Sequence, residues 1–352
     1  MRLEFLENRR RRRGSVLILV LIVISSMTIL AVGLAYRTRI EMKLAQADAL
    51  RTKVYYLALG GIERAKALLS QRELSSANIA GICLFNGTAE EEGLFALLKD
   101  CDLQEGASLA YCLRDEQGYL NVNKSDSAAW ENTGSISKEN RACILDWIDP
   151  DDDTSPDGAE TYFYERMEPP YVSKNGPYVA LKELLFARTI TPDSYRGKDS
   201  SWNSLQAADR SKTKLQFVLD AGENITDWGL VNIFTVYGDG KININTASGT
   251  ILSSLSGLDS EVAQAILAFR SGPDGQFGTD DDVCVENAAA IANIEGLTEL
   301  QIELLQQYCC FGSEYFRIFS YAVLNNAFEC CLMATVKAGG NQLQVICLER
   351  LL

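Results

Sequence analysis

The chain has 352 residues, of which 47% are hydrophobic and 23% charged, a composition that excludes a largely disordered or fibrous protein. Its 33 Lys and Arg residues against 47 Asp and Glu residues give a formal net charge of −14, so a polyanion is not the expected partner. Because the sequence contains no histidine, mechanisms that need an imidazole base or a histidine ligand are also excluded.

The N-terminal segment predicts a membrane span. Residues 9–13 are five consecutive arginines, Gly14 follows them, and residues 15–36 contain no charged side chain. About 20 apolar residues are enough for a helix to cross a bilayer. Since the arginines precede the span, the positive-inside rule places the N-terminus in the cytoplasm and most of the chain on the other side. The alternatives are a simple signal anchor and a secretory signal cleaved near residues 31–33.

An amphipathic helix is expected to continue the span. Apolar residues recur at three- and four-residue intervals, at Ile40, Leu44, Ala47, Val54, Ala58, Ile62, Ala65 and Leu68. No proline occurs before Pro150, although Gly60-Gly61 is a place where the helix could bend. We therefore predict one helix from Ser15 to about Ser70, roughly 80 Å long, whose second half lies against a globular head.

These N-terminal features resemble those of type IV pilin-like proteins. The resemblance rests on the basic leader, on Gly14 at its end and on the apolar helix that starts at Ser15. It implies that a prepilin peptidase cleaves after Gly14 and methylates the new terminus at Ser15. Most members of that family carry a glutamate at the fifth mature position, where this sequence has Leu19. In that family the glutamate pairs with the terminal amine of the neighbouring subunit, so a subunit without it is expected at the tip of a filament. Its absence fits a subunit that lacks this partner, because an unpaired carboxylate in a bilayer is costly.

The densest acidic segment predicts a calcium site. Residues 146–160 contain seven carboxylates and no Lys or Arg, and hard oxygen ligands of this kind suit Ca²⁺. The spacing is that of EF-hand ligands, with Asp149, Asp151, Asp153, Ser155, Asp157 and Glu160 at positions 1, 3, 5, 7, 9 and 12. Position 6 is Thr154, where an EF-hand loop has glycine, so an authentic EF-hand turn is not expected. The alternative is a solvated acidic loop.

A second candidate calcium loop lies at residues 272–283. It contains three glycines, which permit tight turns, and its candidate ligands are Asp274, Asp280 and Asp282. A simple turn is the alternative.

Longer segments resemble the minor pseudopilin K family of the type II (general) secretion pathway. They are CILDWIDPDDDTSPDGAETYFYERMEPPYVSKNGP followed by LKELL, GKININTASGTILSSLSGLDSEVAQAILAFR, and GSEYFRIFSYAV near the end of the chain. Little of residues 198–228 can be aligned. The resemblance implies an α+β fold, in which a long N-terminal helix and a pilin-like head with an antiparallel sheet are interrupted by a large, mainly helical inserted domain. It also implies calcium sites within that insertion.

Six parts are expected along the chain. They are a prepilin leader (1–14), the transmembrane part of the N-terminal helix (15–36), its periplasmic part (37–72), the first part of the head (73–123), the inserted helical domain (124–312) and the C-terminal strands of the head (313–352). The residues agree with this order, because 107–122 alternates like a hairpin around a turn at 115–118. Residues 320–351 also alternate, with turns at 325–326 and 339–341.

Two short helical hairpins are expected in the insertion. One turns at Gly257, and the other turns at Gly296, where Thr298 and Gln301 form a capping-box pattern. They resemble helix-hairpin-helix units, which in other proteins bind DNA phosphates. Without its leader the chain has 27 basic and 45 acidic residues, a charge unfavourable for DNA binding. We therefore interpret the hairpins as packing modules.

Neither the cysteines nor any sequence motif indicates an active site. The ten cysteines all lie from Cys83 onward, where placement beyond the membrane favours disulfides and a reduced set is the alternative. There is no phosphate-binding, dinucleotide-binding or nucleophile-elbow motif, so no enzymatic activity is expected. An anchored hydrolase built on the acidic cluster is the enzymatic alternative.

The patterns together predict a non-enzymatic minor pseudopilin that initiates or caps the type II secretion pseudopilus, for protein export across the outer membrane. It would cross the inner membrane once, with its N-terminus in the cytoplasm and its head in the periplasm. The resemblance implies minor pseudopilins I and J, the major pseudopilin and the prepilin peptidase as partners, and a tip position would bring the head near secreted proteins. The alternatives are a minor pilin of a type IV pilus system and a membrane-anchored helix-hairpin-helix DNA-binding protein.

Overall fold

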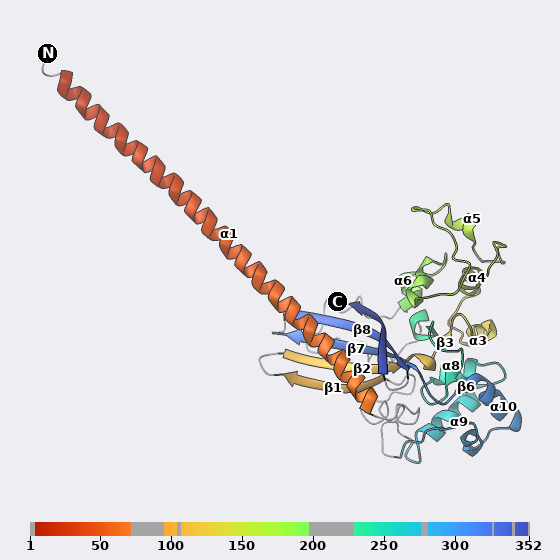
Figure 1. Ribbon diagram of the computed structural model, residues 1–352. Coiled ribbons are helices and arrows are strands. Elements are labelled where there is room, and N and C mark those ends of the chain that lie inside the picture. The colour runs from red at the N-terminus through yellow and green to blue at the C-terminus, as the bar shows by residue number, and fades with distance from the viewer. Residues whose placement is uncertain are drawn as a thin grey trace. The chain divides into compact units, whose positions relative to one another are not determined.

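The computed structural model describes residues 4–71, 95–103, 107–196, 229–275, 281–325, 327–339 and 342–350 (Figure 1). The chain divides into two compact units, Met1–Tyr55 and Tyr56–Leu352.

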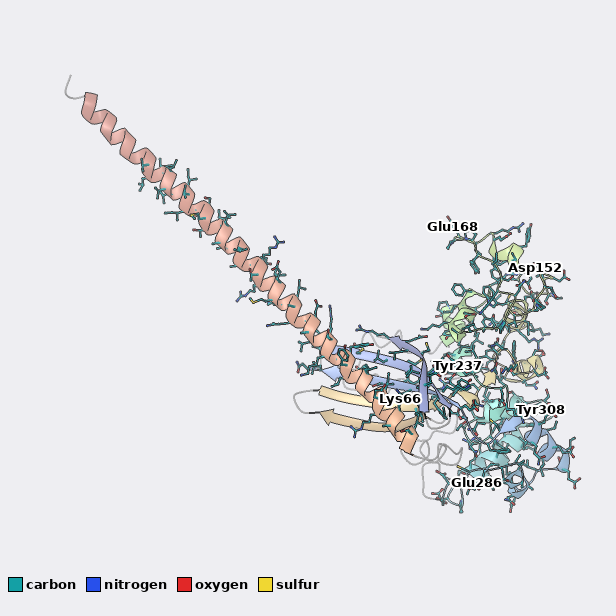
Figure 2. The ribbon with its side chains drawn as sticks, in the orientation of Figure 1. Lys66, Asp152, Glu168, Tyr237, Glu286 and Tyr308 are labelled. Atoms are coloured by element: carbon teal, nitrogen blue, oxygen red, sulfur yellow. The ribbon has the colours of Figure 1, made fainter. Side chains whose placement is uncertain are left out.

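The first unit is the N-terminal part of one long helix. Helix α1 runs from Glu4 to Gln71 without interruption, which confirms the predicted helix and shows that Gly60-Gly61 does not break it. The side chains described from Val16 to Gln46 are all exposed, and Figure 2 draws them projecting from all sides of the helix. The most apolar window of this helix has a mean hydropathy of 2.8 and no buried residue. Such a surface suits lipid or other apolar helices as its surroundings.

The second unit contains a five-stranded antiparallel sheet. In spatial order its strands are β1 (Phe95–Leu103), β2 (Ala107–Asp115), β7 (Tyr315–Leu324), β8 (Phe328–Gly339) and β9 (Gln342–Arg350). All four strand pairings are antiparallel. Since β2 pairs with β7, the chain leaves the sheet after Asp115 and returns to it at Tyr315. The predicted α+β class, with a sheet interrupted by a mainly helical region, is confirmed.

The last turns of α1 bury one stripe of side chains. Ala58, Ile62, Ala65 and Leu69 are at most 1% exposed, and their spacing places them on one side of the helix. Residues 316–322 of β7 are all buried, and those on one side of the strand, Phe316, Ile318, Ser320 and Ala322, are 0% exposed. Figure 1 draws the end of α1 across this sheet. The helix therefore supplies the apolar cover that one face of the sheet needs.

The hairpin predicted around residues 115–118 is wrong. Strand β2 ends at Asp115, and the 3-10 turn η1 (Glu116–Gly118) follows. Strand β3 (Leu120–Asn121) then pairs in parallel with β4 (Phe234–Thr235), in a separate small sheet. The alternation that suggested a hairpin belongs to two strands of different sheets. Asn325 follows β7 at a φ of 55°, which agrees with the turn predicted at 325–326. Residues 326, 340 and 341 of the two predicted C-terminal turns lie outside the described residues.

The region between β2 and β7 is mainly helical. Besides η1, β3 and β4, the elements in its described residues are α3 (Ser127–Asn132), α4 (Lys138–Asp146), α5 (Thr161–Tyr164), η2 (Leu181–Phe186), α6 (Pro192–Arg196), η4 (Leu230–Asn232), β5 (Ile242–Asn243), α8 (Gly249–Ser254), α9 (Ser260–Arg270), η5 (Ala290–Asn293), α10 (Glu299–Tyr308) and β6 (Cys309–Cys310). They share an apolar core that includes Trp130, Ile144, Tyr164 and Phe234.

Both predicted helical hairpins are present. The first joins α8 to α9 through Gly257 at a φ of 84°, and the second joins η5 to α10 through Gly296 at a φ of 86°. The predicted capping box at the start of α10 is formed by Thr298 and Gln301. A Cβ added to Gly257 would lie 2.8 Å from Leu304 Cδ1, so the loop of the first hairpin packs against α10 of the second.

Buried charges join the helical region to the sheet. Arg317 on β7 forms an ion pair with Glu116, with 2.6 Å between Nε and Oε1, and Thr235 Oγ1 donates to Glu116 Oε2 at 2.7 Å. The neighbouring Asp115 Oδ2 accepts from Ser313, Thr246 and Asn243 side chains at 2.6, 2.6 and 2.9 Å. Burial raises the pKa of Asp115, against these hydrogen bonds, which lower it. Because these partners lie on both sides of the junction, the insertion is fixed where it leaves and re-enters the sheet.

Candidate metal centre

The acidic loop connects α4 to α5 and brings three carboxylates together. Asp146 is the last residue of α4, Glu160 precedes α5, and Asp149 lies on the loop between them. One carboxylate oxygen of each lies within 4.8 Å of the others. Asp146 is 0% exposed, Glu160 is 1% exposed and Asp149 is half-buried. Two of the three charges are therefore removed from water.

Backbone contacts of the loop allow this close approach. Ser155 N donates to Asp146 Oδ2 at 3.2 Å, and Asp157 turns the chain with a φ of 71°. A Cβ on Gly158 would lie only 2.0 Å from Asp146 Oδ2, so this position needs glycine for the carboxylate to fit. The guanidinium of Arg188 donates to Gly158 O at 3.3 Å and holds the loop from outside.

The environment of the cluster disfavours three bare negative charges. Burial raises the pKa of Glu160 to about 7, and the charges of Asp149 and Asp146 contribute to the same shift. Burial also raises the pKa of Asp149, with a further contribution from Asp151. Within the part of the chain that the structure describes, Asp146 Oδ1, Asp149 Oδ1 and both carboxylate oxygens of Glu160 have no hydrogen-bond partner. Buried, unpartnered carboxylate oxygens fit a hard cation, which would supply the missing positive charge.

The other candidate ligands of this loop lie outside the cluster. Asp151, Asp153 and Asp157 are exposed, as is Asp152, which Figure 2 labels. Asp151 Oδ1 accepts from Asp153 N at 2.9 Å, which makes a local turn. Asp149 and Glu160 are thus brought together, and their third partner, Asp146, was missed. The EF-hand spacing count starts at Asp149 and cannot include a carboxylate at the end of the preceding helix.

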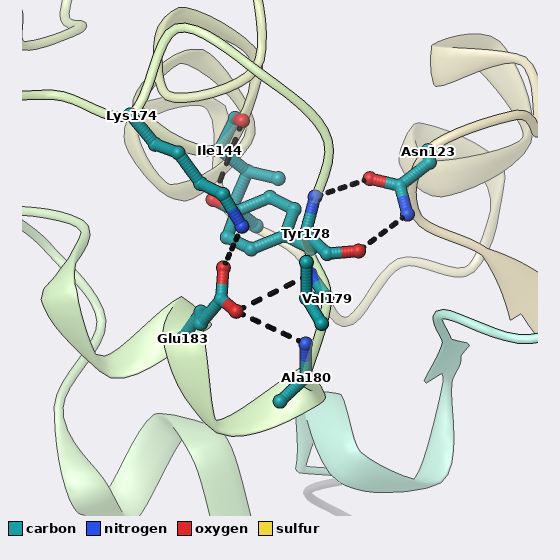
Figure 3. A network of polar contacts seen from close by, with 7 residues as sticks. All are labelled: Asn123, Ile144, Lys174, Tyr178, Val179, Ala180 and Glu183. Carbon is teal, nitrogen blue, oxygen red and sulfur yellow. Dashed lines mark hydrogen bonds and ion pairs between the residues drawn. The ribbon is translucent and has the colours of Figure 1, made fainter. Parts of the chain in front are cut away.

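A hydrogen-bonded loop lies next to this centre (Figure 3). The side-chain amide of Asn123 accepts from Tyr178 N at 2.8 Å and donates to Tyr178 O at 2.9 Å. Glu183 accepts from Ala180 N at 3.1 Å and from Lys174 Nζ at 2.6 Å. Asn175 Nδ2, on the same segment, donates to the backbone oxygen of Asp151 at 2.9 Å. These bonds hold residues 171–186 against the acidic loop.

The second candidate loop lies near a positively charged side chain, that of Arg270. Asp274 N donates to Asp281 Oδ2 at 3.1 Å, and the buried guanidinium of Arg270 donates to Ala247 O at 2.7 Å. Burial lowers the pKa of Arg270 to about 10, whereas the nearby charges, including that of Asp282, act to raise it. No cluster of three metal ligands within the described residues includes Asp274 or Asp282, and Asp280 lies outside them. A second calcium site stays a prediction.

The processing site and the cysteines are placed only in part. Gly14 and Ser15 lie within α1, and the side chain of Ser15 lies outside the described part of the structure. Among the cysteines whose side chains are described, Cys143, Cys309, Cys310, Cys330 and Cys347 are free thiols.

Comparisons with known proteins bear on the region that contains the metal centre. Residues 135–197 match the family model described as type II secretion system (T2SS), protein K, and residues 238–281 match that of the helix-hairpin-helix motif. No curated protein matches the chain. Among solved structures, the chain is similar to one chain of the GspK-GspI-GspJ complex from the type 2 secretion system of enterotoxigenic Escherichia coli. The two are 15% identical with a TM-score of 0.50, and the match covers 89% of this chain and 99% of that one.

These comparisons confirm the resemblance to the minor pseudopilin K family that the sequence predicts. The protein K match includes Asp146, Asp149 and Glu160, so the residues of the metal centre lie inside the segment that carries the resemblance. The structural match supports the fold, and the helix-hairpin-helix match covers α8, Gly257 and α9.

Proposed function

We propose that this protein is a minor pseudopilin of a type II secretion system, and that it initiates or caps the pseudopilus at its tip. The observation that carries the proposal is the insertion between β2 and β7, which contains the segment similar to protein K. A domain of this size beside a pilin-like sheet is too wide to repeat along a thin shaft. Leu19 agrees with a tip position, because in the family a glutamate at this place pairs with the neighbouring subunit's terminal amine.

The exposed part of α1 in the first unit supports a role in holding the subunit in the membrane before assembly and in joining it to the pseudopilus. Its apolar surface contacts lipid while the subunit waits in the inner membrane, with the N-terminus in the cytoplasm and the head in the periplasm. On assembly, helices of other subunits replace the lipid, and the gain comes from closer helix packing. The prepilin peptidase cleaves after Gly14 and methylates Ser15 before this step.

The proposed partners are minor pseudopilins I and J, with the major pseudopilin below them. The similar solved structure is a complex of GspK with GspI and GspJ, which supports this choice. A minor pilin of a type IV pilus is the alternative, and the genes beside this one would separate the two systems.

The tip position is tested by counting copies. Pseudopilus fibres sheared to different mean lengths are analysed by quantitative mass spectrometry for this protein and for the major pseudopilin. We expect one copy per fibre at every length. A copy number that rises in proportion to fibre length would place the protein in the shaft and refute the tip role.

We also propose that Asp146, Asp149 and Glu160 bind Ca²⁺ and so stabilise the inserted domain. The support is the set of buried oxygens without hydrogen bonds in a loop that has no Lys or Arg. A ligand that binds only the folded state raises the free energy of unfolding, so chelation should lower the melting temperature. An Asp146→Asn variant should lose this response, and the variant Glu165→Gln, at an exposed residue outside both candidate loops, should keep it. An unchanged melting temperature after chelation would refute calcium binding by this cluster.

The geometry of the hairpins gives no support to the DNA-binding alternative. Leu304 packs against the loop at Gly257, and the loop at Gly296 is flanked by Glu295 and Glu299. Phosphates would be repelled by these carboxylates. We expect no shift of duplex DNA in a gel at low salt, and a shift that weakens steeply as salt rises would contradict this expectation.

A further inference from the structure

Charge is distributed unevenly between the two units of the chain. Residues 15–36 carry no charge, residues 37–55 carry five basic and two acidic side chains, and residues 56–352 carry 22 basic and 43 acidic ones. The segment directly after the apolar span is therefore positive, although the rest of the chain beyond it is strongly negative. A short positive segment next to a strongly negative region is complementary in charge to an anionic surface at the same position along the helix.

The length of the helix places the first three basic residues at a membrane surface. Residues 15–36 form about 33 Å of helix, which matches a hydrocarbon core of about 30 Å. Arg37, Arg39 and Lys43, which we name the basic collar, occupy the next 10 Å or so of α1, within reach of the lipid headgroups. All three side chains are exposed.

The contacts of the collar leave its positive charge available. Arg39 and Lys43 are four residues apart and so share one side of α1, and neither forms an ion pair within the described part of the chain. Arg37 Nε lies 3.3 Å from Glu41 Oε1, but the two side chains are 80% and 64% exposed. Such a pair holds its partners weakly, so Arg37 can exchange it for a phosphate.

We propose that the basic collar binds the phosphate groups of anionic phospholipids in the leaflet next to the head. Arginine and lysine stems extend along the apolar surface while their charged groups reach the headgroups. The acidic head is repelled by the same lipids, so attraction is confined to the collar. This inference rests on the membrane span of the proposed function and adds the class of lipid that holds the unassembled subunit.

The test uses the full chain in nanodiscs made of equal parts phosphatidylglycerol and phosphatidylcholine. Native mass spectrometry measures the ratio of the two lipids that stay bound when the protein is released. The collar variant R37Q/R39Q/K43Q is compared with R51Q/K53Q/R64Q, which removes the same charge starting about 12 Å further along α1. That distance exceeds the screening length of about 8 Å at physiological salt. The leader arginines are present in every variant and cancel in the comparison.

We expect the unsubstituted chain and the control variant to retain phosphatidylglycerol preferentially, with ratios within about twofold of each other. The collar variant should lower the ratio at least about fivefold, the factor expected for the loss of one cation at an anionic surface. An equal fall in both variants, no fall in either, or no preference in the unsubstituted chain would overturn the proposal. Failure of the chain to enter nanodiscs of phosphatidylcholine alone would instead refute the membrane span.

Discussion

Replacing Glu160 by Gln should make the protein more stable when calcium is absent and less responsive when it is present. Gln keeps the shape of the side chain and removes its charge. Glu160 is 1% exposed and lies within 4.8 Å of Asp146 and Asp149, so its ionisation in the folded state is opposed by burial and by two neighbouring carboxylates. A bound cation reverses this effect, because it needs the charge that Gln lacks.

The magnitude follows from the pKa of Glu160, which burial raises from 4.5 to about 7. Because the folded-state pKa is the higher one, the protonated form stabilises the fold below pH 4.5, and this stabilisation is lost as the pH rises through 7. At 1.36 kcal/mol for each pKa unit, the cost of keeping Glu160 folded and ionised is about 3 kcal/mol at pH 8. At pH 4.5 it is below about 0.5 kcal/mol.

The assay is urea unfolding of the detergent-solubilised full chain between pH 4.5 and 8, in chelator and in calcium. The difference between Glu160→Gln and the unsubstituted chain isolates this one group from all the others. In chelator the variant should gain about 3 kcal/mol over the unsubstituted chain at pH 8 and almost nothing at pH 4.5. In calcium at 100 times its dissociation constant, the unsubstituted chain should gain about 2.7 kcal/mol and the variant much less.

A matched control is Glu165→Gln, since Glu165 is exposed and lies just beyond the acidic loop. Its unfolding curves should follow those of the unsubstituted chain at every pH. If Glu160→Gln does the same in chelator, the cluster is not shielded from water as the geometry requires, and the reasoning fails.

Three further changes give defined outcomes. Gly158→Ala should lower the free energy of unfolding by about 1–3 kcal/mol and weaken calcium binding, because the added Cβ overlaps the Asp146 carboxylate. The control Gly176→Ala adds only an ordinary contact at 3.7 Å, so it should be nearly neutral when both variants are compared by calorimetry. Arg317→Met leaves the buried carboxylate of Glu116 without its ion-pair partner and should lower the free energy of unfolding in urea by about 3–5 kcal/mol. A loss no larger than that of the control Lys337→Met, which removes an exposed ion pair, would contradict the buried junction. Gly14→Leu should leave the full-length chain in the membrane, and normal processing seen by intact mass would refute the leader interpretation.

Features with a local cause are the ones that the sequence predicts well. The course of α1 follows from a stripe of apolar residues, and the turn at Gly257 follows from the need for a positive φ. The start of α10 follows from Thr298 and Gln301, which satisfy each other's backbone groups. In each case the residues that cause the feature lie within a few positions of it.

Features that depend on contacts between distant segments of the chain cannot be predicted from local sequence patterns. Strand β2 pairs with β7, and nothing in residues 107–122 distinguishes that partner from a hairpin with its own continuation. Asp146 joins the carboxylate cluster because the end of α4 and the turn at Gly158 bring it there, whereas a count along the loop begins three residues later. Spacing finds ligands that share a loop, and it misses one supplied by the element that precedes the loop.

The junction at the sheet explains how one chain combines a pilin-like head with a large insertion. The insertion starts at Glu116, in the turn η1 directly after β2, and ends just before β7 begins at Tyr315. Glu116 forms a buried ion pair with Arg317 on β7. Asp115, the last residue of β2, accepts hydrogen bonds from Ser313, just before β7, and from Asn243 and Thr246 within the insertion, so both ends of the insertion are tied to one place. An insertion held at a single point leaves the remaining strand pairs and the face covered by α1 unchanged. The same head can therefore keep the helix-on-sheet packing of a pilin-like subunit while it carries a separate, mainly helical domain.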